Sequence, residues 1–265
     1  MILRTLWRHV ACNVAMTLEY RGAFLIYMLN TIAGPLVALG VWLAASEHGA
    51  ALPFGRDQLV TYYVLLSLVV MLTGTWAAMF VAESIRTGSL SPLLLRPVPP
   101  ILDYLGNNIG EKVIKLMLLL PLVLVVGLLF RDDLRLPGDP VLWLLFALSL
   151  PGAAALAFLL DFVIGSLAFW IEDVNGLVRV KNVAGAFLAG QYVPLALFPS
   201  WLDGFLTAQP FRYTISFPLE ILTGQLAPEA AAQGFAVQLA YCAALWGCYR
   251  LLWRAGLRQY AAAGA

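Results

Sequence analysis

Charged residues are scarce in this chain of 265 residues. Asp, Glu, Lys and Arg make up 12% of it and hydrophobic residues 62%, whereas a soluble domain has about 25% charged residues. The mean hydropathy is +0.85. So few charges indicate that most of the surface faces lipid. The formal net charge of +1 also argues against a nucleic acid as the main partner, because phosphate binding needs clustered cations.

The motifs of catalysis are missing as well. The sequence has no G-x-x-x-x-G-K-[ST] phosphate loop, no H-E-x-x-H and no G-x-S-x-G. Cys12, Cys242 and Cys248 are an odd number and form no C-x-x-C pair, so they predict neither a metal site nor a disulfide framework. We therefore expect no catalytic residue, metal site or cofactor in this chain. If the protein performs a process that consumes energy, another protein chain must supply that energy.

Long apolar runs are plentiful and predict an all-α membrane protein. A helix needs about 20 apolar residues to cross a bilayer core. Six runs approach this length, at residues 23–45, 59–82, 113–130, 141–164, 178–198 and 232–253. The fourth continues to Trp170, and the fifth is the weakest because Gly185, Gly190 and Pro194 interrupt it. We expect six transmembrane helices in a single domain over residues 1–265.

The distribution of Lys and Arg predicts the orientation. With the N-terminus inside, 12 of the 16 basic residues fall in the inner segments and 4 in the outer loops. This split satisfies the positive-inside rule. Both termini are therefore expected in the cytosol, and a multi-pass protein of a bacterial cytoplasmic (inner) membrane fits this pattern.

Residues 1–21 predict an amphipathic helix that lies in the membrane interface. Apolar residues recur at helical spacing on one side, with Arg4 and Arg8 towards the other. The mixture of charged and apolar residues does not resemble a cleavable signal peptide.

The connector at residues 83–112 is too polar to cross a bilayer. It opens on the basic turn Arg86-Thr87-Gly88, and the Ser89 that follows is a predicted N-cap of a short helix. We expect this segment to be ordered and cytosolic.

Leucines give this short helix one apolar face. Leu90, Leu93 and Leu94 follow the i, i+3, i+4 spacing, and Arg96 comes next. Three prolines then end the helix: Pro97, Pro99 and Pro100. The leucine face must be buried against something, and either the groove of a soluble partner or the underside of the bundle meets that need.

The outer segment at residues 199–231 is too long for a hairpin and too apolar for an ordinary loop. Four prolines divide it into pieces of about two turns: Pro199, Pro210, Pro218 and Pro228. We expect re-entrant half-helices that dip into the outer leaflet. Irregular backbone at that depth persists only where protein buries it or water surrounds it, so the segment should pack into or cover a cavity.

Three acidic residues lie near the predicted membrane boundaries. Asp161 falls near the inner headgroups, where a structural ion pair with Lys or Arg, or a wetted carboxylate, is the ordinary role and a functional one the alternative. Glu220 follows Pro218 and either faces a translocation path or faces periplasmic water. Glu83 is expected to pair with Arg86 at i+3.

Three stretches in order resemble the type-2 ABC export permeases, and within them the compact six-span branch. The first is Ile85-Arg86-Thr87-Gly88-Ser89-Leu90 followed by Leu94-Leu95-Arg96-Pro97. The second is Gly190-Gln191-Tyr192-Val193-Pro194 with Phe198-Pro199, then Pro210-Phe211, Pro218 and Gly224. The third is the tail Trp253-Arg254-Ala255-Gly256-Leu257-Arg258-Gln259-Tyr260. The resemblance covers essentially the whole chain.

This resemblance implies a transmembrane permease domain that dimerises above ATP-binding cassette ATPase subunits. The second permease copy makes either a homodimer or a paralogous heterodimer, and ATP and Mg belong to the partner ATPase. The resemblance assigns ATPase coupling to one set of residues: Arg86, Gly88, Ser89, Leu90, Leu93, Leu94, Arg96 and Pro97. It assigns the translocation path or outer gate to another: Gly190, Pro194, Phe198, Pro199, Phe211, Pro218 and Glu220.

The expected function is export of a hydrophobic or amphipathic substrate out of the cytosol, such as a drug-like compound, a lipid or a lipid-linked glycan. Apolar, aromatic-rich spans with little charge favour such cargo. Two other functions stay open at this point. A stand-alone secondary transporter or channel needs coupling charges inside the spans, for which Asp161 and Glu220 are the candidates, and a degenerate permease does not transport at all.

Overall fold

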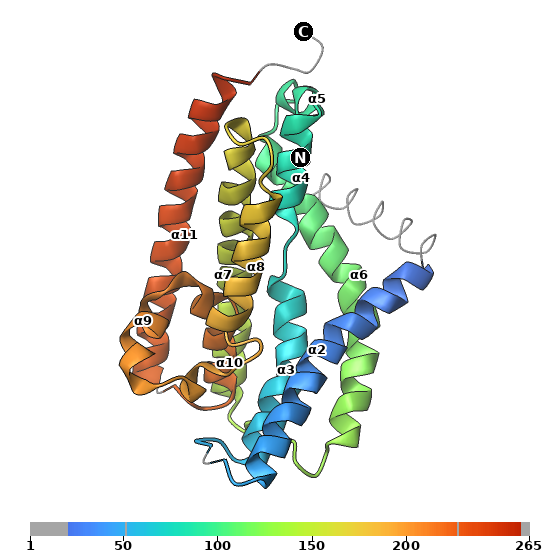
Figure 1. Ribbon diagram of the computed structural model, residues 1–265, viewed down its shortest axis with the longest axis vertical. Coiled ribbons are helices and arrows are strands. Elements are labelled where there is room, and N and C mark those ends of the chain that lie inside the picture. The colour runs from blue at the N-terminus through green and yellow to red at the C-terminus, as the bar shows by residue number, and fades with distance from the viewer. Residues whose placement is uncertain (1–20, 51, 227, 261–265) are drawn as a thin grey trace.

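The computed structural model describes residues 21–50, 52–226 and 228–260, and these residues form helices and connecting turns without a β-strand. The amphipathic helix predicted at residues 1–21 lies outside the described residues except for its last position. Figure 1 shows a bundle of long helices with several short ones between them.

The long helices run along the height of the bundle (Figure 1). Their bounds are α2 Arg21–Glu47, α3 Arg56–Thr73, α6 Pro100–Leu129, α7 Pro140–Ser166 and α11 Pro228–Leu257. The shorter α-helices are α4 Ala77–Arg86, α5 Ser91–Leu94, α8 Asn175–Leu188, α9 Asp203–Ala208 and α10 Ser216–Leu222. Four 3₁₀ turns complete the described part: η1 Leu167–Phe169, η2 Leu195–Leu197, η3 Ser200–Leu202 and η4 Pro210–Thr214.

Four helical stretches of the described chain are long and apolar enough to cross a membrane. They are Arg56–Arg86, Pro100–Leu129, Pro140–Phe169 and Glu229–Leu257, and Thr31–Glu47 is a shorter apolar stretch. They correspond to the second, third, fourth and sixth predicted runs. The helix predicted at 113–130 begins much earlier, at Pro100, because its proline occupies the first helical position, where no backbone N–H is needed.

The fifth predicted run is not confirmed as a crossing. Helix α8 has 14 residues and ends at Leu188, which corresponds to about 21 Å at 1.5 Å per residue. A bilayer core is about 30 Å thick. The chain then turns at Gly190, one of the residues that weakened this run in the sequence.

The second run, predicted as continuous over 59–82, is broken in the structure. Helix α3 ends at Thr73 and α4 begins at Ala77. Gly74 takes an extended conformation there, with ψ 146°. The hydroxyl of Thr75 accepts a hydrogen bond from the backbone N–H of Ala77 at 3.2 Å. A small residue followed by a hydroxyl side chain is the sequence signal for this break.

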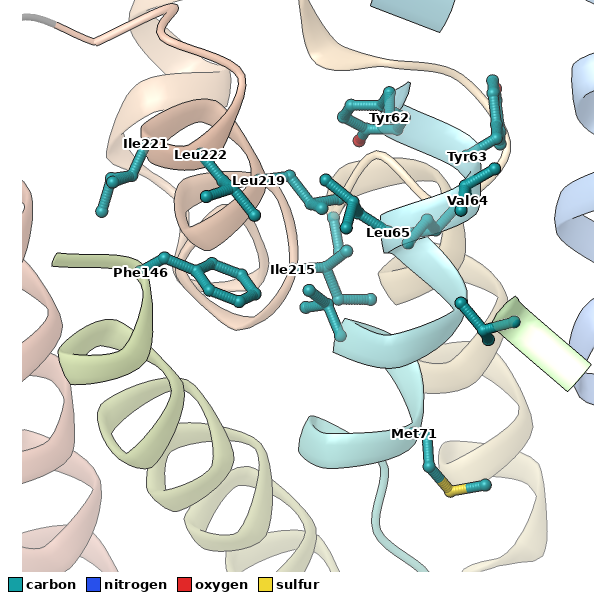
Figure 2. Packing of buried hydrophobic residues seen from close by; sticks show 14 of the residues in the cluster. Tyr62, Tyr63, Val64, Leu65, Met71, Phe146, Ile215, Leu219, Ile221 and Leu222 are labelled. Carbon is teal, nitrogen blue, oxygen red and sulfur yellow. The ribbon is translucent and has the colours of Figure 1, made fainter. Parts of the chain in front are cut away.

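Helix α3 is the central helix of the bundle. It packs against α2, α6, α7 and α10, and Tyr63 and Leu66 on it are fully buried. Figure 2 shows Leu65 of α3 and Leu219 of α10 pointing towards each other, beside Ile215. Because residues 59–67 of α3 are all buried, their apolar side chains stabilise the bundle rather than face lipid.

A second buried cluster joins α4, α7 and α11 near the end of the bundle where α5 lies (Figure 1). Phe162 of α7 is its centre, with Tyr249 and Trp253 of α11 at ring-centroid distances of 5.0 and 5.4 Å. The ring of Phe169 packs on Trp253 at 5.3 Å and over Gly256. The tail motif therefore packs against η1, and a larger residue at position 256 would meet that ring.

Helices α4 and α7 approach closely at Gly165. A Cβ at this position would lie 2.8 Å from the backbone oxygen of Ala78 and 2.9 Å from Cβ of Val81. Only glycine allows the two backbones to pack at this distance.

Gly165→Ala should therefore lower the free energy of unfolding by about 1–3 kcal/mol, the usual cost of overpacking. Gly247→Ala on α11 is the control, because a Cβ there meets nothing within 4 Å. Denaturant unfolding of both variants in a mild detergent measures the difference. Equal stability of the two variants would contradict the close packing of α4 on α7.

Candidate functional site

The connector leaves α4 through a tight turn. Gly88 has φ +76°, a left-handed conformation that favours glycine. The backbone N–H of Leu90 then donates to the carbonyl of Ser84 at 2.9 Å, which closes the turn. The N-cap predicted at Ser89 is wrong: α5 begins at Ser91 with Leu90 in the cap position, and the Ser89 hydroxyl lies 3.0 Å from that of Thr87.

The leucine face of the connector is buried against the bundle itself. Leu90 is 0% exposed, and Leu93 and Leu94 pack against the cluster around Phe162. The structure thus selects the underside of the bundle between the two possibilities that the sequence left open. The side chain that points away is Leu95, which is 87% exposed. Sequence periodicity could not single it out, because it stands in an unbroken run of leucines.

Side-chain hydrogen bonds fix the connector at both ends. The hydroxyls of Ser91 and Tyr260 lie 3.0 Å apart, so the tail motif reaches the connector directly. The Arg96 guanidinium donates to the Asp103 carboxylate at 3.2 Å. Pro97 is exposed in the bend that leads to α6.

The expected pair of Glu83 and Arg86 is confirmed. The Arg86 guanidinium donates to the Glu83 carboxylate at 2.7 Å, and both side chains are more than half exposed. An exposed i,i+3 pair contributes little to stability, so these charges stay available to solvent or to a partner.

Asp161 forms a buried ion pair, as expected for its position. Its carboxylate is 2.5 Å from Nζ of Lys181 on α8, and the residue is 1% exposed. The other carboxylate oxygen accepts from the backbone N–H of Ala78 at 3.4 Å. One side chain of α7 thus holds both the start of α4 and the middle of α8.

The turn after α8 is held by three aromatic side chains. Gly190 has φ +81°, and its carbonyl accepts a hydrogen bond from the Tyr62 hydroxyl at 2.8 Å. The carbonyl of Tyr192 accepts from the Tyr63 hydroxyl at 2.9 Å and from the indole N–H of Trp42 at 3.0 Å. These donors satisfy backbone groups that have no helical partner, as irregular backbone inside a membrane requires.

The other residues assigned to the outer gate are spread over the short helices. Pro194 is buried before η2, and Phe198 and Pro199 follow it on the way to η3. Pro218 lies inside α10 and is buried. Phe211 lines a cavity and also packs over Gly185.

Glu220 faces neither open water nor that cavity. Its carboxylate is 2.6 Å from the Arg212 guanidinium, and the two side chains are 12% and 14% exposed. The residue is one half of a buried ion pair that ties α10 to η4, and a place for it in the translocation path stays a prediction. The sequence could not show the pair because the partners are eight positions apart and belong to two different short elements, η4 and α10.

Two cavities lie at the break between α3 and α4. The larger, of about 340 Å³, lies between the break, α7, α8 and η4, and Lys181 and Asn182 are in its wall. The smaller, of about 270 Å³, lies between α2, the break and α6, and Glu111, Lys112 and Lys115 are in its wall. Trp76 and Tyr192 line both cavities.

A family model described as "ABC-2 family transporter protein" matches residues 38–264 of the chain. The match includes the connector, the break, α8 and the tail motif. A comparison with curated proteins finds no match.

The Asp161–Lys181 pair predicts an unequal pattern of mutational effects. Lys181→Met leaves a buried carboxylate without its cation and should cost about 3–5 kcal/mol of stability. Asp161→Asn added to Lys181→Met removes the buried charge while an amide oxygen still accepts from Ala78. The double variant should therefore be more stable than Lys181→Met alone.

Thermal or denaturant unfolding of the two single variants and the double variant measures this coupling. Additive losses of stability, with the double variant the least stable of the three, would contradict the buried ion pair.

Proposed function

Because the chain belongs to the ABC-2 family of transporter proteins, we propose that it is the permease subunit of an ABC exporter. Members of this family are transmembrane components that generally work with an ABC ATPase. The proposed cargo is a hydrophobic or amphipathic compound moved out of the cytosol. ATP and Mg would bind to the separate ATPase subunit, and this chain would supply the path.

The observation that supports coupling most strongly is the exposed Leu95. It is the exposed leucine of a connector whose other leucines pack against the bundle, with the exposed Arg86 and Arg96 on the same segment. A large apolar side chain flanked by cations suits a pocket on a soluble partner, where burial of a leucine side chain contributes about 1.5–3 kcal/mol. Leu95 was not among the coupling residues taken from the sequence. Leu90, which was among them, is buried in the cluster around Phe162 and would support the connector rather than contact the ATPase.

The anchoring of the connector supports force transmission. Leu90 is fully buried under α4, and Ser91 is hydrogen-bonded to the tail at Tyr260. A push on Leu95 would therefore move α5 and α4 together, up to the break at Gly74. The two cavities are adjacent to that break, so the push would change their shape.

The remaining architecture is proposed from the family. Two permease copies, identical or paralogous, would dimerise in a bacterial cytoplasmic membrane with both termini in the cytosol. The ends of the bundle fit this orientation, because α5 and the C-terminal end of α11 lie at one end and the α2–α3 and α6–α7 loops at the other (Figure 1). The short helices α9 and α10 lie beside the lower half of α11 in that view, as re-entrant pieces would.

Leu95→Asp should reduce co-purification of the ATPase subunit by about tenfold or more, because it removes a large apolar anchor and introduces a carboxylate that must be desolvated. The control is Gln259→Asp, which introduces the same negative charge at an exposed position just after α11. This position lies at the end of the bundle where α5 also lies. Pull-down of each tagged variant from membranes, with unchanged insertion, measures the effect. Full co-purification with Leu95→Asp would refute the coupling role.

The topology can be tested with single cysteines in a chain lacking Cys12, Cys242 and Cys248. Leu95→Cys should react with a membrane-impermeant maleimide only from the cytosolic side. Trp201→Cys, at an exposed position before α9, should react only from outside. Labelling of Leu95→Cys in intact cells would show that the connector lies outside the cytosol and would contradict the proposed orientation.

A further inference from the structure

The lysines of the chain gather around the break between α3 and α4. There are three of them, Lys112, Lys115 and Lys181, and each lines one of the two cavities. All other basic residues are arginines, and none of the arginines from position 56 to position 258 is in either cavity wall. Lysine is a compact point charge on a flexible stem, which suits an anion that must be bound and then released.

The charges of the two cavities differ. In the larger cavity, Lys181 is neutralised by Asp161 at 2.5 Å. In the smaller cavity, Lys115 pairs with Glu111 one helical turn away. Lys112 forms no ion pair with a carboxylate within the described ranges 21–50, 52–226 and 228–260. The described wall of the smaller cavity therefore has a net charge of +1.

The depth of the smaller cavity matches the headgroups of the inner leaflet. From Leu129, at the end of α6 away from the connector, to Lys112 is about 26 Å along the helix. From Arg56 to Gly74 along α3 is about 27 Å by the same rise. The hydrocarbon core is about 30 Å thick. If the outer ends of both helices lie at the outer boundary, Lys112 and the break lie near the inner one.

We propose that the smaller cavity binds the anionic headgroup of an amphiphile that arrives from the inner leaflet, with Lys112 as its main cationic contact. Thr31 and Gln191 contribute polar groups to the wall, and Pro35, Val70 and Met71 contribute apolar ones. Trp76 and Tyr192 separate this site from the larger, charge-neutral cavity. The assignment to the inner leaflet and to cargo rests on the proposed function.

The test measures lipid binding to the purified full-length chain in a neutral detergent. Native mass spectrometry follows binding of phosphatidylglycerol, with phosphatidylcholine as the zwitterionic comparison. Lys112→Gln should weaken phosphatidylglycerol binding about fivefold, the effect of one lysine near an anionic headgroup. Lys112→Arg should retain most of the binding, and Arg254→Gln, which removes an exposed charge from α11, should have little effect.

A second pair of variants tests the cavity without changing its charge. Gly34 lies in the cavity wall, and a Cβ there meets nothing within 4 Å. Gly34→Phe should therefore direct a ring into the cavity and weaken phosphatidylglycerol binding. Gly40→Phe is its control on the same helix, since Gly40 also has open space but is in neither cavity wall.

The outcomes separate the possible ligands. Equal binding of phosphatidylglycerol by Lys112→Gln and the unmodified chain, or by Gly34→Phe and Gly40→Phe, would overturn the proposal. Competition by millimolar inorganic phosphate would identify a site for a soluble anion and would also overturn it. The measurement uses the permease alone, so it is independent of whether an ATPase co-purifies.

Discussion

The buried carboxylate of Asp161 is the interaction on which the arrangement around the break depends. It accepts a hydrogen bond from the first turn of α4 and holds Lys181 of α8 at 2.5 Å. Without a partner a buried charge is strongly destabilising, so α4 and α8 cannot leave α7 independently. The break at Gly74 stays open between these fixed elements, and the two cavities form beside it.

This arrangement links the connector to the cavities by continuous packing. The connector is fixed to α4 by Leu90 and to the tail by Tyr260, and α4 packs on α7 at Gly165. A discontinuous helix concentrates bending at one place, because its backbone hydrogen bonds are interrupted there. Displacement of the connector would thus change the break more than the packed helices on either side of it.

Sequence reasoning recovered the elements that depend on local composition. Hydropathy predicted the long spans, and i,i+3 spacing predicted the pair of Glu83 and Arg86. An ion pair was one of the roles it left open for Asp161, but it could not name Lys181, because the two meet only when α7 and α8 pack together. It also placed Lys112 in a connector outside the membrane. The structure continues α6 through this residue, so its charge becomes part of a cavity wall.

The proposed function depends on Leu95, at the tip of the anchored connector, docking an ATPase subunit. The measurement to make is crosslinking in the native membrane from a photoreactive amino acid placed at position 95 of the tagged chain, followed by a mild-detergent pull-down and mass spectrometry. We expect an ATP-binding cassette subunit in the eluate, crosslinked through position 95. Recovery of the permease alone, under conditions that preserve other membrane complexes, would contradict it and favour a transporter that works without an ATPase.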